Sequence, residues 1–109
     1  MPYTLQMHTF VETRLFTRLA DEYLGNAGLF ALQIHLLAQP KIGDVIPGSG
    51  GVRKLRWTMP GRGKRGGMRV IYFLRLSQGE IWLLTLYPKN FTDNISAAVL
   101  RRIKEAIDD

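Results

Sequence analysis

The stretch that decides the fold is residues 68–87, MRVIYFLRLSQGEIWLLTLY. Its first part, Met68–Leu76, is a nearly continuous run of Val, Ile, Tyr, Phe and Leu, which are residues that favour β-strands. Residues 77–79 (Ser-Gln-Gly) predict a tight turn, and a second apolar run extends from Glu80 to Tyr87. The stretch therefore predicts a β-hairpin within a mainly antiparallel sheet.

A third strand is predicted immediately upstream of this hairpin. In Val52–Trp57, Leu55 and Trp57 are expected on one face, and Lys54 and Arg56 on the other, because side chains alternate along a strand. The flanking residues 41–51 and 59–67 are rich in glycine and lack periodicity, which predicts loops.

A short strand over residues 10–13 and two helices are predicted before these loops. Thr13 is the expected cap of the first helix. Its apolar stripe consists of Leu15, Phe16, Leu19, Tyr23 and Leu24. Gly25-Asn26 is expected to break this helix, and the second is expected to extend to about Ala38. It has two apolar ridges, Leu29/Leu32/Leu36 and Phe30/Ile34/Leu37, and we expect both to lie on the sheet.

A last helix is predicted after Asn94, which is its expected cap. Its expected inner face is Ile95, Val99, Ile103 and Ile107, and its expected outer face is Arg101, Arg102 and Lys104. The order strand, two helices, three strands, helix indicates the α+β class. We expect one domain over residues 1–109, with a small twisted, mainly antiparallel sheet, two N-terminal helices on one face and a C-terminal helix.

Positive charge is concentrated in one segment. The chain has a net charge of +6, and the window Val45–Gly79 contains no Asp or Glu. The basic residues of this window are Arg53, Lys54, Arg56, Arg62, Lys64, Arg65, Arg69 and Arg75. A solvated charged face usually mixes both signs. The uneven distribution therefore predicts a polyanionic partner, most commonly a nucleic acid.

Several other kinds of chemistry are excluded or disfavoured. There is no cysteine, so disulfides and thiolate chemistry are excluded. His8 and His35 are far apart and the acids are scattered, so we expect neither a metal site nor a cofactor. No apolar run approaches the roughly 20 residues of a membrane span, and the N-terminus does not resemble a signal peptide. We therefore expect a cytoplasmic protein with no membrane partner.

A glycine motif at residues 61–66 is misleading. It matches G-x-G-x-x-G, but a predicted strand follows it, where a dinucleotide-binding loop requires a helix. The dipeptide Gly63-Lys64 precedes Arg65 in place of the hydroxyl residue that a P-loop uses. Both matches reflect the abundance of glycine.

The cations instead indicate a surface for RNA. Lys54 and Arg56 share one face, Arg69 begins the next strand, and Tyr87 ends the last. RNA carries its own nucleophile, the 2′-hydroxyl, so its cleavage without a metal requires a base, stabilisation of the phosphorane and an acid. A lysine surrounded by other cations is suited to be the base, and a fixed arginine to hold the phosphate. The same residues also fit a surface that only binds.

Three segments resemble the HigB-type branch of the RelE toxin family: Gly43–Arg56, Gly63–Tyr72 and Leu83–Asn90. The resemblance covers nearly the whole chain in the right order. It implies the RelE-like fold and metal-free cleavage of messenger RNA on the ribosome through the substrate 2′-hydroxyl. It also implies a cognate antitoxin as partner, HigA-like and with a helix-turn-helix domain.

The resemblance also assigns roles to residues. It implies that Arg69 stabilises the phosphate, that Lys54 is the general base, and that Arg56 acts electrostatically. Tyr87 or Lys89 lies near the position of the general acid. The residues expected to bind RNA are Arg53, Arg62, Lys64, Arg65 and Asn90. Two alternatives stay open: a non-catalytic module that binds RNA or DNA, and an inactive homologue that binds an antitoxin.

Overall fold

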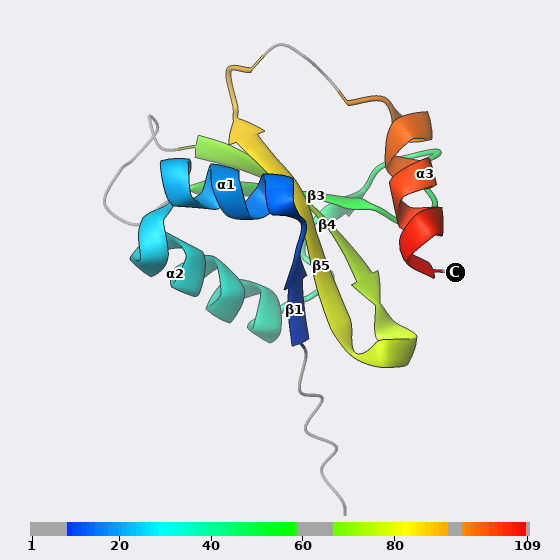
Figure 1. Cartoon of the computed structure of the whole chain (residues 1–109), viewed down its shortest axis with the longest axis horizontal. Coiled ribbons are helices and arrows are strands. Elements are labelled where there is room, and N and C mark those ends of the chain that lie inside the picture. Colours follow the sequence, from blue (N-terminus) through cyan, green and yellow to red (C-terminus); the bar gives the residue numbers. More distant parts are fainter. Residues whose placement is uncertain (1–8, 59–66, 92–94, 109) are drawn as a thin grey trace, which may run out of the picture.

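The protein forms a small α+β domain in which helices lie on both faces of one sheet (Figure 1). The computed structural model describes residues 9–58, 67–91 and 95–108. Within them the elements are β1 (Thr9–Glu12), α1 (Arg14–Tyr23), α2 (Gly25–Ala38), β2 (Asp44–Val45), β3 (Arg53–Thr58), β4 (Gly67–Arg75), a 3₁₀ turn (Leu76–Gln78), β5 (Glu80–Pro88) and α3 (Ala97–Asp108). None of the helices found there is long and apolar enough to cross a membrane.

The sheet has the strand order β1-β5-β4-β3-β2. The predicted hairpin is confirmed as β4 and β5, and β3 pairs antiparallel with the free side of β4. One edge is parallel, since β1 runs alongside β5. The sheet is therefore mixed, with antiparallel pairing at every other junction.

The other edge corrects the sequence prediction. Asp44 and Val45, expected in a loop, form β2 opposite Lys54 and Arg53. A strand of two residues is too short to show alternation, so its sequence gives no signal.

The two N-terminal helices cover one face of the sheet (Figure 1). The expected cap of α1 is confirmed, because Thr13 Oγ1 accepts a hydrogen bond of 3.0 Å from the Phe16 N–H. Phe16 is fully buried, as are Leu32 and Leu36 of α2. These residues form a core with the strand residues that point the same way, which are Leu55, Trp57, Met68, Val70, Tyr72, Ile81, Leu83 and Leu86.

The predicted packing of α2 is only half right. The ridge Leu29/Leu32/Leu36 faces the core, but Phe30, Ile34 and Leu37 are 64 %, 51 % and 42 % exposed. A helix on a sheet buries one side, and nothing in the described ranges covers the opposite side of α2. The expected break after the first helix is confirmed, since α1 ends at Tyr23 and Gly25 begins α2. The positive φ of 67° at Gly25 allows a direct reversal from α1 into α2.

The third helix lies on the opposite face, and its orientation differs from the prediction. Leu100 is buried, whereas Ile95, Val99 and Ile103 are 38–39 % exposed. Lys104, expected on the outer side, holds its Nζ 5.5 Å from the centre of the Phe73 ring. A lysine can cover apolar surface with its stem, so a pattern of apolar residues alone misjudged this helix. The expected cap Asn94 lies outside the described residues, and Ser96 Oγ accepts a hydrogen bond from Val99 N–H.

The central strands contribute side chains to the cores on both faces of the sheet. Val70 and Tyr72 of β4 point toward α1 and α2, whereas Ile71 and Phe73 point toward α3. This explains why the sequence of β4 is continuously apolar. The core under α3 consists of Val52, Ile71, Phe73, Leu84 and Leu100. It is the smaller of the two, and this face of the sheet also carries Lys54, Arg56 and Arg69.

Candidate nucleic-acid interface

Three predicted site residues lie in one row across the sheet. Arg56 of β3 is directly opposite Arg69 of β4, and Arg69 is directly opposite Tyr87 of β5. Directly opposite residues of neighbouring strands project to the same face, with Cβ atoms about 5 Å apart. Since Tyr87 packs against the core under α3, the row belongs to the face that α3 partly covers. We call these three residues, together with Lys54 on the same face, the cationic row.

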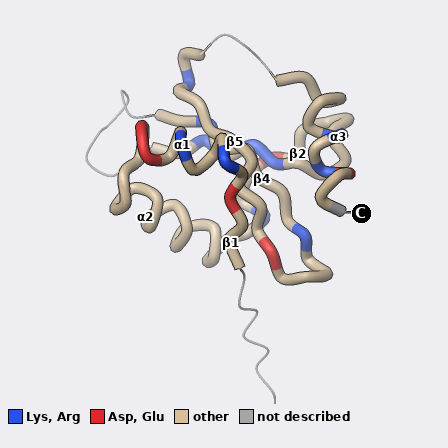
Figure 2. Tube along the Cα trace, viewed as in Figure 1, with Lys and Arg blue, Asp and Glu red and all other residues tan. Residues whose placement is uncertain are grey.

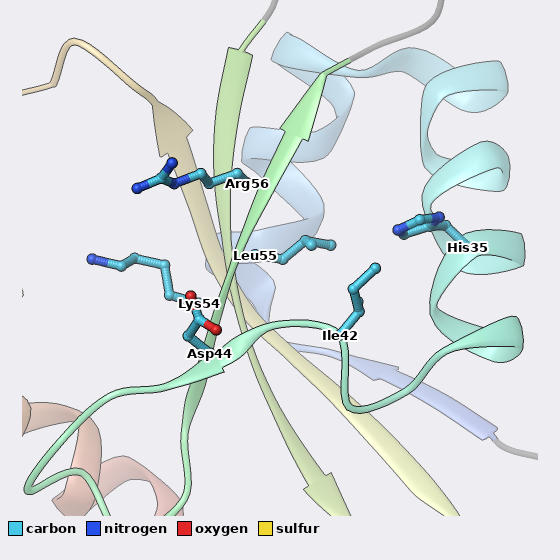
Figure 3. Close-up of a pocket in the computed structure, with 6 residues that line it drawn as sticks. All are labelled: His35, Ile42, Asp44, Lys54, Leu55 and Arg56. Atoms are coloured by element: carbon cyan, nitrogen blue, oxygen red, sulfur yellow. The ribbon is translucent and has the colours of Figure 1, made fainter.

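Lys54 joins this row because it precedes Arg56 by two positions on β3. It is opposite Ile71, which also points toward α3. Figure 3 shows Lys54 and Arg56 leaving β3 on one side, whereas Leu55 points toward His35 of α2 on the other. The predicted alternation of β3 is thus confirmed. The residues drawn there, which include Ile42 and Asp44, line a cavity of about 290 Å³ at the edge of the sheet.

The charge of the cationic row is not neutralised by ion pairs between described residues. Arg75 pairs with Glu80 at 3.3 Å and Arg101 with Glu105 at 3.4 Å, and neither pair includes a residue of the row. Figure 2 shows basic positions along the central strands and on α3, whereas α2 has no charged residue. Like charges directly opposite each other in a sheet are destabilising. Arg56 beside Arg69 therefore raises the energy of the free protein, and a bound anion would lower it.

A second cavity adjoins the cationic row. It has a volume of about 220 Å³ and lies between α3, the loop before β3 and the sheet. Its described lining is Ile46, Lys54, Ile71, Tyr87, Ile95 and Leu100. Four of these six residues are aliphatic, but more of the exposed wall is polar than apolar, and Lys54 and Tyr87 are the lining residues with polar side chains. We call it the α3 cavity.

The end of β5 places two further groups beside the row. The ring of Tyr87 lies 5.8 Å from that of Phe91, which is half exposed. Lys89 donates its backbone N–H to the Gly67 carbonyl at 3.1 Å. A Cβ at Gly67 would approach Lys89 Cδ to 3.0 Å, so this glycine leaves room for the lysine stem. Asn90 is exposed in the turn that follows.

Arg53 is separated from these residues. It lies opposite Tyr72 and therefore points to the other face of the sheet. Its Nη1 donates to the carbonyls of Gly43 at 2.7 Å and Lys41 at 3.1 Å. The Tyr72 hydroxyl binds the same loop, residues 40–43 before β2. It donates a hydrogen bond to Pro40 O at 2.7 Å and accepts one from Gly43 N–H at 2.8 Å. Burial raises the pKa of Tyr72. The structure thus gives Arg53 a role in holding the loop before β2.

The remaining predicted residues are not placed. Arg62, Lys64 and Arg65, expected to bind RNA, lie outside the described residues, as does His8. Where side chains are described, no three His, Asp or Glu residues are grouped closely enough to hold a metal ion. His35 lies against Trp57, with 5.2 Å between the ring centres.

The aliphatic residues that line the α3 cavity were not predicted from the sequence. Ile46, Ile95 and Leu100 line the α3 cavity but come from segments that are far apart along the chain. Phe91 directly follows Lys89 and Asn90, and an aromatic residue beside predicted RNA-binding residues was the one available signal. No family model matches the chain.

The arrangement has a definite chemical capacity. Arg56 and Arg69, at paired positions of neighbouring strands, can offer several N–H donors to one phosphate, and charge-assisted hydrogen bonds of this kind are strong. Lys54 supplies an amine on the same face, and Tyr87 supplies a hydroxyl that can donate or accept a proton. The face therefore has what is needed to bind a phosphodiester and to move protons around it.

Proposed function

We propose that this protein is the toxin of a type II toxin–antitoxin module, an endoribonuclease of the RelE/HigB kind that cleaves messenger RNA on the ribosome. The observation that carries the proposal is the row of Arg56, Arg69 and Tyr87 in register across three strands, with Lys54 on the same face. The sequence resemblance, which implies catalytic roles for these four residues and for Lys89, supports the same proposal.

In the proposed reaction the RNA 2′-oxygen attacks the adjacent phosphorus. Lys54 removes the proton from the 2′-hydroxyl, and the bond between phosphorus and the 5′-oxygen breaks. Arg69 and Arg56 stabilise the negative charge that builds on the phosphorane oxygens, which is where fixed donors accelerate a reaction most. Tyr87 or Lys89 protonates the departing 5′-oxygen. The products are a 2′,3′-cyclic phosphate and a free 5′-hydroxyl.

A protein partner and a cytoplasmic location belong to the same proposal. The partner is a HigA-like antitoxin with a helix-turn-helix domain, which binds the toxin and neutralises it. The exposed apolar ridge of Phe30, Ile34 and Leu37 supports the need for a protein partner, because apolar surface of this kind is typical of interaction sites.

Expression from a tightly repressed promoter tests the proposal. Induction of the wild type should arrest growth and yield cleaved messages, and Arg69→Ala should abolish both effects at equal protein levels. Arg18→Ala is the matched control, since Arg18 is an exposed arginine on α1. Arrest by Arg69→Ala with unchanged cleavage would contradict the mechanism. Salt-sensitive RNA binding without cleavage by the wild type would identify a binding module instead.

A further inference from the structure

The outer side of α2 carries apolar residues at a regular spacing. Four exposed residues, Ala27, Phe30, Ile34 and Leu37, follow one another at intervals of three, four and three positions. Residues at these intervals lie along one line of a helix. Two helices that pack side by side make contact along such a line, with the side chains of each helix in the gaps of the other. We call these four residues the α2 seam.

The surroundings of the α2 seam contain no ionic groups. Figure 2 shows no Lys, Arg, Asp or Glu along α2, and its sequence contains none. The residues on either side of the seam are small or uncharged, namely Asn26, Ala31, Gln33 and Ala38. Charged residues beside a helix contact select a partner of complementary charge. Without them the seam fits a helix that is equally free of charge, and the α2 of a second copy meets this requirement.

The α2 seam is complementary to itself when two copies of α2 run antiparallel. Its midpoint falls between Phe30 and Ile34, so Phe30 of one copy lies opposite Ile34 of the other. Ala27 then lies opposite Leu37, which places a small side chain against a large one. A parallel pair would place Ala27 opposite its own copy and leave a gap. The antiparallel arrangement also brings opposite ends of the helix dipoles together, which is favourable.

The distribution of charge favours a contact through α2. The chain has a net charge of +6, so two copies repel each other wherever their basic surfaces approach. The cationic row lies on the face that α3 partly covers, whereas α2 lies on the other face (Figure 1). Two copies that meet through α2 therefore keep their cationic rows on opposite outer sides of the pair, where this repulsion is weakest.

We propose that α2 is the interface of a homodimer, in which the seams of two copies pack antiparallel and both cationic rows stay accessible. The inference goes beyond the proposed function and does not depend on it, because it concerns the opposite face of the sheet. One helix of 14 residues is about 21 Å long, so a contact restricted to it is smaller than the roughly 800 Å² per partner of a standard interface. The dimer is therefore expected to be weak and to form as the concentration rises.

Sedimentation equilibrium of the purified full chain between about 1 μM and 1 mM tests the inference. The wild type should change from monomer to dimer within this range. Ile34→Glu places a charge in the middle of the seam and should raise the dissociation constant at least about tenfold, since a buried charge without a partner is costly. Thermal unfolding followed by circular dichroism confirms that each variant folds.

Leu76→Glu is the matched control. Leu76 is 58 % exposed and Ile34 is 51 % exposed, but Leu76 belongs to the turn between β4 and β5. Its substitution introduces the same charge on a similarly exposed apolar residue outside the seam. The dissociation constant of this variant should equal that of the wild type.

A mixing experiment tests the antiparallel arrangement. Phe30→Lys alone should also stay monomeric, because it places a charge in the seam. Mixed in equal amounts with Ile34→Glu, it should form a heterodimer, since the introduced ammonium and carboxylate groups then lie opposite each other. In a parallel pair these two groups would not meet. A restored heterodimer also shows that both variants are folded.

Three results would overturn the inference. The first is a wild type that stays monomeric up to about 1 mM. The second is a dimer that Leu76→Glu weakens as much as Ile34→Glu does, and the third is a mixture that forms no heterodimer. A monomeric wild type whose binding to a co-expressed antitoxin is abolished by Ile34→Glu would assign this surface to the antitoxin instead. Cleavage of messenger RNA is measured separately, so none of these results affects the proposed function.

Discussion

The two faces of the sheet differ in how completely they are covered. On one face α1 and α2 enclose a core that includes Phe16, Leu32 and Leu36, all fully buried. On the other face α3 covers a smaller core and leaves Lys54 and Arg56 exposed. Apolar burial is the main favourable contribution to folding. The first face therefore stabilises the domain, and the second is available for binding an anion.

Position along the strand assigns each residue to one of these faces. In β3, Leu55 is buried under α2, while its neighbours Lys54 and Arg56 point away from it. Substitutions one position apart should therefore change different properties. Changes on the first face should lower stability, and changes on the second should lower activity without lowering stability.

The largest effect is expected at Lys54. Lys54→Ala removes the proposed general base, and positioned acid–base groups contribute about 10²–10⁴-fold in rate. Cleavage of ribosome-bound message should fall by that factor while the melting temperature stays that of the wild type. Lys41→Ala is the control, because Lys41 is exposed on the loop before β2. Equal loss in both variants would show that charge alone, and no particular lysine, matters.

The second prediction concerns the covered face. Phe16→Ala leaves a void in the core, which should lower the free energy of unfolding by about 3–5 kcal/mol. Phe91→Ala, on a half-exposed phenylalanine beside Tyr87, should cost about 1 kcal/mol or less. Denaturant unfolding followed by circular dichroism measures both. Similar losses in the two variants would contradict the division of roles between the faces.

A third prediction concerns the buried tyrosine that fastens the loop before β2. Tyr72→Phe removes the hydroxyl and leaves Pro40 O and Gly43 N–H without this partner, which should cost about 1–3 kcal/mol. Tyr23→Phe, on the exposed side of α1, should cost nothing measurable. Equal melting temperatures for Tyr72→Phe and the wild type would contradict this role.

Tyr72 also predicts a dependence on pH. Burial raises its pKa in the folded state above the ordinary value of 10.0, so the folded protein retains the phenolic proton more tightly than the unfolded chain. Its contribution to stability is therefore complete below about pH 10 and decreases as the pH rises above that value. Between pH 9 and about 11 the wild type should lose more stability than Tyr72→Phe. Parallel curves for the two proteins would contradict the assignment.

The smallest effect is a gain in stability. Arg56→Gln removes one of two like charges that face each other, which should raise the free energy of unfolding by about 0.2–1 kcal/mol at low ionic strength. The gain should disappear near 1 M salt, where the screening length is about 3 Å. Arg18→Gln on α1 is the control. A loss of stability at low salt would show that Arg56 is a structural residue.

Much of this arrangement was predictable from the sequence. The β4–β5 hairpin, the cap at Thr13 and the alternation of β3 follow from local patterns, and the structure confirms them. Placing Lys54 and Arg56 on one face needed only the period of a strand. The pairing register of the strands places Arg56, Arg69 and Tyr87 in one row. This register depends on the geometry of the turns as well as on sequence spacing, so it was not predicted.

The rest depended on tertiary contacts. Ile95, Val99 and Ile103 look like an inner face, but Leu100 and the stem of Lys104 occupy the surface toward the sheet. Phe30 of α2 is apolar yet exposed, because α2 is apolar on more than one side and the sheet covers one of them. The α3 cavity combines residues from distant segments of the chain, so no local pattern indicates it.

Cleavage of a defined message by purified protein and ribosomes, with the new 5′ ends mapped, tests the central claim most directly. The wild type should produce discrete cuts without an added metal cofactor, each leaving a 5′-hydroxyl. Arg69→Ala should cut at least about 10²-fold more slowly, since it lacks a donor to the phosphorane, while Arg18→Ala cuts like the wild type. Equal cleavage by Arg69→Ala and the wild type would contradict the account.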